Sequence, residues 1–195
     1  GLVEGDALAA VLPVDLNGQC APMSSLTAIA SQHDSIVIED ACHALGATYR
    51  GESGNSPVGA CGAAAMAIFS GHPVKTVATG GGGVVTTNDD GLASRLKLLR
   101  SHGIVRSPAA FLDSEQAFDT EGEANPWYYE MQEVGFNYRL SDIHSALGMS
   151  QLRKLKQFVD KRQDLVAHYR KVLAPLAPVV RPIPDAGTGV PAWHV

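Results

Sequence analysis

Hydrophobic and polar positions along the chain follow two periods, one typical of strands and one of helices. Residues 35–40 form an apolar run that ends in Glu39 and Asp40, as a parallel strand does when its carboxyl end opens into a site. Shorter apolar or β-branched runs predict three further strands, at 11–15, 63–70 and 84–87. The first of these runs is followed by an Asn17-Gly18 turn.

Helical spacing appears in three segments, and they alternate with the strands. The apolar positions of 23–32 fall on one side, and a second helix follows the two aspartates 89 and 90. From Ser141, a good N-cap, one long helix is predicted to run to Leu173, where Pro175 and Pro178 end it. Residues 105–125 are polar and irregular, and we expect a long loop there. This alternation predicts an α/β sheet with crossover helices.

Composition narrows the class of protein. Of the 195 residues, 45% are hydrophobic and 18% are charged, which is a normal balance for a globular protein with a sizeable core. The net charge of −5 and the lack of a basic cluster argue against nucleic-acid binding, and no apolar run is long enough to span a membrane. Cys20, Cys42 and Cys61 lack C-x-x-C spacing, which predicts reduced thiols in a cytoplasmic protein.

Both ends of the chain look truncated. The sequence opens on Gly1, and it stops at Val195 just as an apolar segment begins. We therefore expect a fragment that is inactive in isolation.

Three local features could carry chemistry, and each also has a plain interpretation. Asp40, with His43 close by, could pair with a ligand cation, or it could cap the next turn. Lys75 follows a predicted buried strand and could act as a Schiff-base nucleophile, or it could be an exposed lysine after a proline turn. Ser70 could donate to a phosphate. The glycine run 79–83 permits close approach to a ligand, but on its own it favours a plain hairpin or tight turn, and it is not a P-loop.

The order and spacing of five motifs resemble the DegT/DnrJ/StrS family of sugar aminotransferases. The motifs are the strand end at 37–47, the lysine motif at 70–75, the glycine-rich turn and strand at 79–88, and two further blocks at 100–104 and 135–142. The resemblance runs from about Val11 to His194. Residues 126–132 are similar to the branch of the family that aminates a UDP-linked 4-keto-6-deoxy-N-acetylhexosamine on the way to pseudaminic acid.

The resemblance implies a fold and a cofactor. The fold would be the large domain of fold-type-I pyridoxal-phosphate transferases, a mostly parallel seven-stranded sheet between helices. Lys75 would bind pyridoxal 5'-phosphate covalently and shuttle a proton, and Asp40 would pair with its pyridine nitrogen. His43 would lie near the phenolic oxygen, and Ser70 would bind the phosphate.

The resemblance also implies a homodimer with a shared active site. Asn137, and with it Arg139, would reach the phosphate of the neighbouring subunit's cofactor. L-glutamate would be the amino donor and a nucleotide sugar the acceptor. In this scheme residues 1–140 belong to the cofactor-binding large domain, 141–174 form a long linking helix, and 175–195 begin a truncated small domain.

The sequence departs from the family pattern at a few positions. Gly71 stands where a bulkier residue is usual, Gly81 replaces an acidic residue, and His144 replaces a glutamine. The two glycines could loosen the packing around a cofactor, although neither removes a catalytic group. Two alternatives stay open: a sugar dehydratase-type relative, in which histidine replaces the lysine, and a regulator that binds cofactor or nucleotide sugar without turnover.

Overall fold

The computed structural model describes residues 8–51 and 54–194. Gly1 and Val195, on which the expectation of a fragment rests, lie outside this range. The contacts divide the chain into two compact units, one made of residues 1–88 and 140–195 and the other of residues 89–139. The predicted division at residues 140 and 174 remains a prediction.

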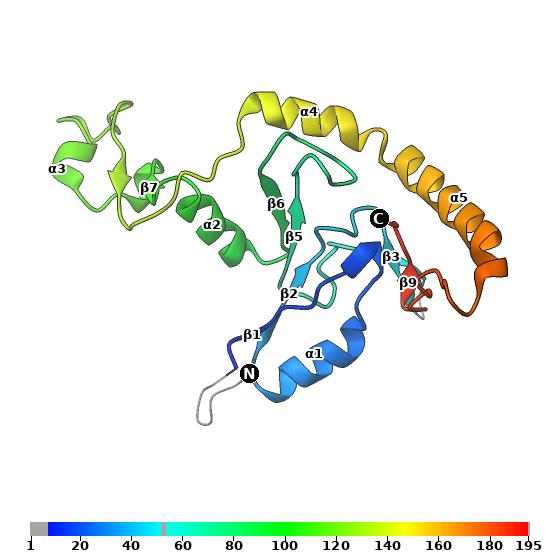
Figure 1. The fold of residues 1–195 in the computed structure, drawn as a ribbon. Helices are drawn as coiled ribbons and strands as arrows, with labels where there is room; N and C mark the ends of the chain where they lie inside the picture. The colour runs from blue at the N-terminus through cyan, green and yellow to red at the C-terminus, as the bar shows by residue number, and fades with distance from the viewer. Residues whose placement is uncertain (1–7, 52–53, 195) are drawn as a thin grey trace. The chain divides into compact units, whose positions relative to one another are not determined.

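A four-stranded sheet forms the centre of the first unit. Its strands are β1 (Ala10–Val11), β2 (Ile36–Asp40), β5 (Met66–Ser70) and β6 (Gly83–Thr86), in that spatial order (Figure 1). β1, β2 and β5 are parallel, and β6 runs antiparallel to β5. The largely parallel sheet predicted from the alternation of elements is therefore confirmed.

The register of β2 and β5 places two predicted site residues at one edge of the sheet. Asp40 is paired with Ile68, and Ser70 ends β5 two residues later. Because β2 and β5 are parallel, their carboxyl ends open on the same side. Asp40 and Ser70 thus lie at neighbouring strand ends.

The prediction of a buried strand at 11–15 is wrong in length and in burial. β1 has two residues, and the side chains of Leu12 and Val14 are 61% and 51% exposed. Pro13 interrupts the ladder because it has no N–H to donate. Its carbonyl still accepts from the Asp40 N–H (2.8 Å), and an isolated bridge joins Val14 to Asp40.

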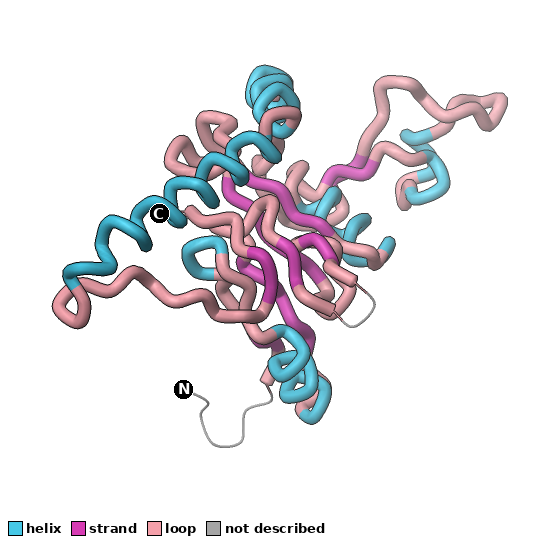
Figure 2. The backbone as a smooth tube through the Cα atoms, turned by 90° about the vertical axis from the view of Figure 1, so that its right-hand side faces the viewer, coloured by secondary structure: helices cyan, strands magenta, loops and turns pink. Residues whose placement is uncertain are grey.

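Figure 2 distinguishes the helices (cyan) from the strands (magenta) along the backbone. α1 (Met23–Gln32) packs against β1 and β2, in agreement with the predicted helix. The single helix predicted from Ser141 to Leu173 is wrong: α4 (Asp142–Leu152) and α5 (Leu155–Leu173) are separate helices that change direction between them (Figure 1).

The break between α4 and α5 has a local origin and a packing consequence. Lys154 is the N-cap of α5, and its backbone (φ −101°, ψ −1°) lies at the edge of the right-handed helical region. α5 then places Leu155 and Val159 against the turn at Gly46. The partial burial of these side chains stabilises the position of α5.

Short elements complete the first unit. β3 (Thr48–Tyr49) lies between β4 (Ser56–Pro57) and β9 (Gly189–Val190) in a small antiparallel sheet. η1 (Leu16–Gly18) forms the predicted turn, and η3 (Ala174–Leu176) ends the helical region at the prolines. β9 was not predicted, and it returns the end of the chain to the core.

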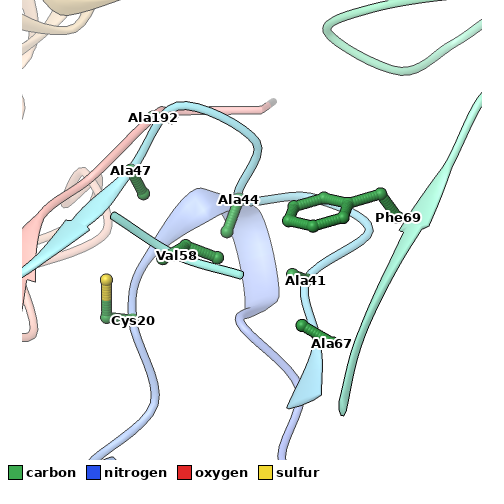
Figure 3. Packing of buried hydrophobic residues seen from close by; sticks show 8 residues of the cluster. All are labelled: Cys20, Ala41, Ala44, Ala47, Val58, Ala67, Phe69 and Ala192. Atoms are coloured by element: carbon green, nitrogen blue, oxygen red, sulfur yellow. The ribbon is translucent and has the colours of Figure 1, made fainter. Parts of the chain in front are cut away.

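The core behind the strand ends is built from small side chains. Figure 3 shows the ring of Phe69 pointing toward Ala41 and Ala44. The buried cluster consists of Cys20, Ala41, Ala44, Ala47, Val58, Ala67, Phe69 and Ala192. Alanine at these positions lets the loop after β2 and the end of the chain approach the sheet closely.

The second unit contains α2 (Asp90–Leu99), η2 (Pro108–Ala110), α3 (Ser114–Ala117) and the hairpin-like pair β7 (Ile104–Val105) and β8 (Glu130–Met131). Asp89 caps α2 by accepting from the Leu92 N–H (2.9 Å), as the sequence predicted. The predicted loop is largely irregular, but it includes η2 and α3.

Candidate active site

Four of the six predicted site residues line one cavity of the first unit. The cavity has a volume of about 270 Å³, and its walls are formed by Val14, Asp40, Cys42, His43, Ser70 and Lys75. A larger hollow of about 440 Å³ lies beside Tyr49 and Arg50, and no predicted site residue lines it. The residues selected by their chemistry therefore converge on the smaller cavity.

The Asp40 carboxylate is fixed by its own backbone neighbourhood. Its Oδ1 accepts from the Cys42 N–H at 3.1 Å. The Asp40 carbonyl accepts from the Asp15 N–H (3.0 Å), and the Ala41 N–H donates to the Ile68 carbonyl (3.0 Å). The chain is thus hydrogen-bonded to both neighbouring segments at the point where the carboxylate enters the cavity.

Lys75 lies in a tight turn that follows β5. Its N–H donates to the His72 carbonyl (2.9 Å), and the His72 N–H donates to the Ser70 hydroxyl (3.3 Å). Pro73, at the next position, restricts the backbone of this turn. These bonds hold the serine and the lysine in a fixed relation at the cavity.

The segment 79–83 is hydrogen-bonded to this turn and stabilises it. The Thr79 N–H and the Thr79 hydroxyl both donate to the Gly71 carbonyl (2.9 and 3.2 Å). The hydroxyl also lies within hydrogen-bond distance of the Gly81 carbonyl. A Cβ on Gly71 would lie 2.1 Å from Thr79 Oγ1, so no larger residue fits there without a shift. Gly80 and Gly82 have φ of 83° and 78°, which glycine adopts without strain. The run is therefore a tight turn, and the absence of a side chain at Gly71 is required by Thr79.

His43 is stacked on a second histidine. Its ring lies 4.2 Å from that of His194 with an interplanar angle of 24°, and its Nδ1 accepts from the Asn17 N–H (3.4 Å). Burial lowers the pKa of His43, the nearby Lys75 charge lowers it further, and Asp40 opposes this. His43 is thereby kept neutral at the cavity wall.

His194 is more strongly affected than His43. Burial lowers the pKa of His194 to about 4, with further contributions from the charges of His43, Lys75 and Arg162. Both of its ring nitrogens are buried without a hydrogen-bond partner among the described residues. The sequence analysis did not select this residue, because it lies far along the chain from every motif.

Cys42 adds a thiol to the cavity wall. Burial raises its pKa to about 11, and the Asp40 carboxylate adds to this, while Lys75 has the opposite effect. The thiol therefore stays protonated near neutral pH. All three cysteines are free, as predicted.

The two remaining predicted residues, Asn137 and Arg139, belong to the second unit. Asn137 forms an isolated antiparallel bridge with Ser101, and Arg139 donates from Nη1 to the Ser101 hydroxyl (3.3 Å). Both side chains are exposed. Their role at a neighbouring subunit's site remains a prediction.

The whole pattern of motifs matches one known family. The model of the DegT/DnrJ/EryC1/StrS aminotransferase family matches residues 2–195. The chain belongs to this family.

Relatives within the DegT/DnrJ/EryC1/StrS family include sugar aminotransferases. The chain is 37% identical over 164 residues to the Campylobacter jejuni UDP-4-amino-4,6-dideoxy-N-acetyl-beta-L-altrosamine transaminase, covering 84% of this chain and 38% of that protein. It is 32% identical over 187 residues to the Bacillus subtilis spore coat polysaccharide biosynthesis protein SpsC, covering 95% and 44%.

A solved structure supports the fold assignment. Helicobacter pylori PseC, an aminotransferase involved in the biosynthesis of pseudoaminic acid, superimposes with a TM-score of 0.74 at 29% identity, covering 95% of this chain and 44% of PseC. The fold is therefore that of a fold-type-I aminotransferase, as expected. The chain spans less than half the length of these relatives.

The donor set of the cavity fits pyridoxal phosphate. A carboxylate (Asp40) suits a protonated pyridine nitrogen, a primary amine (Lys75) suits the aldehyde, and a hydroxyl (Ser70) suits the phosphate. A metal site is not indicated, since no group of three or more His, Cys, Asp or Glu side chains in residues 8–51 and 54–194 could hold an ion. In the same part of the chain no helix is long and apolar enough to cross a membrane.

The sequence did not point to a buried acidic pair, whose Glu39 lines the larger hollow together with Tyr49. The side chains of Asp15 and Glu39 are 0% and 2% exposed. The Tyr49 hydroxyl lies 2.5 Å from Glu39 Oε1 and 3.2 Å from Asp15 Oδ1, and the Ala21 N–H donates to Asp15 Oδ1 (2.7 Å). One signal was available: Glu39 has the same strand parity as the buried Val37, so it faces inward.

Proposed function

We propose that this protein transfers an amino group to a keto nucleotide sugar, using pyridoxal phosphate bound at Lys75. The observation that carries the proposal is the convergence of Asp40, Ser70 and Lys75 on one cavity from two strand ends and a turn. Membership of an aminotransferase family supports the same reaction class.

Each residue would have a distinct role. Lys75 Nζ would bind the cofactor and then, when released, carry a proton between the cofactor and the substrate carbon. Asp40 would accept a hydrogen bond from the pyridinium N–H and keep that nitrogen protonated. The bound cofactor would supply an electron sink for the carbanion at the reacting carbon. The Ser70 hydroxyl would donate to the phosphate, and the neutral His43 ring would lie against the cofactor.

The substrates we propose are those of the branch indicated by residues 126–132. The acceptor would be a UDP-linked 4-keto-6-deoxy-N-acetylhexosamine of the pseudaminic acid pathway, and the donor would be L-glutamate. The similarity to the Campylobacter jejuni UDP-4-amino-4,6-dideoxy-N-acetyl-beta-L-altrosamine transaminase supports this choice.

A homodimer with a shared active site completes the proposal. Asn137 would reach the phosphate of the cofactor in the partner, and Arg139 would assist. Exposed aromatic rings flank Asn137: Phe136 and Tyr138 stack on each other at 4.9 Å and are 53% and 73% exposed. Such rings are suited to burial in an interface.

A turnover assay tests the proposed reaction. It uses these residues together with any sequence that flanks them in the protein. The cofactor-loaded protein is incubated with L-glutamate and the keto sugar, and aminosugar and 2-oxoglutarate are measured by mass spectrometry. Lys75→Ala should lower the rate of amination by a factor between about a hundred and ten thousand, because it removes the group that carries the proton. Lys161→Ala, an exposed lysine on α5, is the matched control and should leave the rate unchanged.

The outcomes separate the alternatives. Cofactor binding without amination of any nucleotide sugar would favour the non-catalytic regulator. Removal of a sugar hydroxyl in place of amination would favour the dehydratase-type relative, although Lys75 stands where that reaction has a histidine.

A further inference from the structure

Arg162 joins the segment that carries Lys75 to the segment that carries His194. From its place on α5, the Nη1 nitrogen donates to the Thr76 hydroxyl (2.7 Å) and to the Trp193 carbonyl (3.0 Å). Thr76 directly follows Lys75, and Trp193 directly precedes His194, which stacks on His43. One guanidinium nitrogen therefore connects the residue after the lysine with the residue before the stacked histidine.

The surroundings of Arg162 are costly for a charge. Thr76 is 9% exposed and Trp193 is 4% exposed, and burial lowers the pKa of Arg162. In the part of the chain that the structure describes, the ion pairs are Arg95–Glu133 and Lys156–Asp160, so no carboxylate compensates Arg162. A buried charge is disfavoured unless hydrogen bonds offset its desolvation. The two hydrogen bonds to Thr76 and Trp193 supply that offset.

Neighbouring contacts make α5 a rigid support for this bridge. The Trp193 indole N–H donates to Gln163 Oε1 (3.2 Å), and the Arg170 guanidinium lies 5.2 Å from the Trp193 ring centroid. On the side that faces the core, Val159 packs against the buried cluster. α5 is thus anchored to the core close to Arg162 and holds the end of the chain through several side chains.

We propose that Arg162 is a positioning residue that sets the place of the Lys75 turn relative to the segment carrying His194. The inference rests on the proposed function, because the turn has to present Lys75 to the cofactor. A shift of about 1 Å in a reacting group is enough to lower a rate by on the order of a hundredfold.

The test follows the reaction of Lys75 with pyridoxal phosphate, and it does not depend on turnover. Cofactor-free protein is mixed with pyridoxal phosphate, and the rate of covalent attachment is followed by absorbance and confirmed by borohydride trapping. Thr76→Val removes one acceptor of the bridge at nearly constant shape, and Thr76→Ser keeps the hydroxyl. We expect Thr76→Val to react about tenfold more slowly, in line with the loss of a residue that orients a reacting group, and Thr76→Ser to react like the wild type.

Variants of Arg162 test the other end of the bridge. Arg162→Met should be at least as slow as Thr76→Val, and the double variant should be no slower than Arg162→Met, because both changes break the same link. Arg162→Lys keeps the charge but has a shorter reach, so it should remain slow. Lys161→Met, which removes an exposed cation of α5 that takes no part in the bridge, is the control and should react normally. Thermal unfolding of each variant checks that the fold is retained.

Three results would overturn the inference: a wild-type rate for Thr76→Val, a wild-type rate for Arg162→Lys, or independent and additive effects of the two changes. If the wild type itself fails to attach the cofactor at Lys75, the proposed function fails. If the wild type attaches it and the folded Thr76→Val and Arg162→Met variants do so at the same rate, only the role of Arg162 fails.

Discussion

At the residue scale, the buried pair of Asp15 and Glu39 shows how burial changes the chemistry of a side chain. Desolvation raises the pKa of Asp15 to about 7, and the nearby Glu39 carboxylate adds to the effect. The Ala21 N–H and the Tyr49 hydroxyl act in the opposite direction, because they favour the charged form. Asp15 is therefore protonated in the folded state at pH values at which it is ionised in the unfolded chain.

This raised pKa predicts a pH-dependent stability. Asp15 loses its proton near pH 4 in the unfolded state and near pH 7 in the folded state. Because the folded state binds the extra proton between these values, the contribution of Asp15 to the free energy of unfolding falls as the pH rises from 4 to 7. Asp15→Asn should therefore gain stability relative to the wild type across this window, by on the order of a few kcal/mol.

Denaturant unfolding at several pH values between 4.5 and 7.5 measures this difference. Asp164→Asn, at an exposed position of α5, is the control, and its free energy of unfolding should change with pH as that of the wild type does. If the free energy of unfolding of Asp15→Asn also changes with pH as that of the wild type does, the pKa of Asp15 is not raised in the folded state.

Residues with a local sequence context were the ones that could be predicted. Asp40, Ser70 and Lys75 stand at strand ends or just after them, and the structure brings them to one cavity. His194 and Arg162 could not be found in this way, because their roles depend on contacts with residues about 150 and 86 positions away.

At the element scale, the connection between β5 and β6 explains Gly71, one of the glycines that depart from the family pattern. Thr79 is 9% exposed, and its hydroxyl is shared between the carbonyls of Gly71 and Gly81. A side chain at Gly71 would have to displace this hydroxyl and break both contacts. The turn that presents Lys75 therefore depends on direct packing of backbone against Thr79.

Gly71→Ala should lower the free energy of unfolding by about 1–3 kcal/mol, the usual cost of overpacking a buried site. The reason is steric, since the added Cβ would lie 2.1 Å from Thr79 Oγ1. Gly62→Ala is the matched control: no heavy atom lies within 4 Å of the position that its Cβ would take, so its effect should stay within about 0.5 kcal/mol. Equal stabilities of the two variants in urea unfolding would show that the turn can relax.

The elements themselves were predicted where one local rule dominates. The amphipathic spacing gave the bounds of α1 correctly, and the two aspartates gave the start of α2. The break at Lys154 and the short strand β9 were missed because they are set by packing on Gly46 and by pairing with β3, both of which are tertiary.

At the scale of the whole molecule, the family match extends over nearly all of this chain, but the chain matches only part of each relative. The family model covers residues 2–195, but the chain spans less than half the length of the relatives described above. Substrate, donor and dimer are therefore proposals, while the fold and the family are established.

The measurement that tests the central claim most directly is borohydride reduction of the protein after loading with pyridoxal phosphate, followed by peptide mass mapping. We predict a phosphopyridoxyl group on Lys75 and on no other lysine, and its loss in Lys75→Ala. An unmodified Lys75 in folded, cofactor-saturated protein would contradict the aminotransferase assignment and favour a binding protein without turnover.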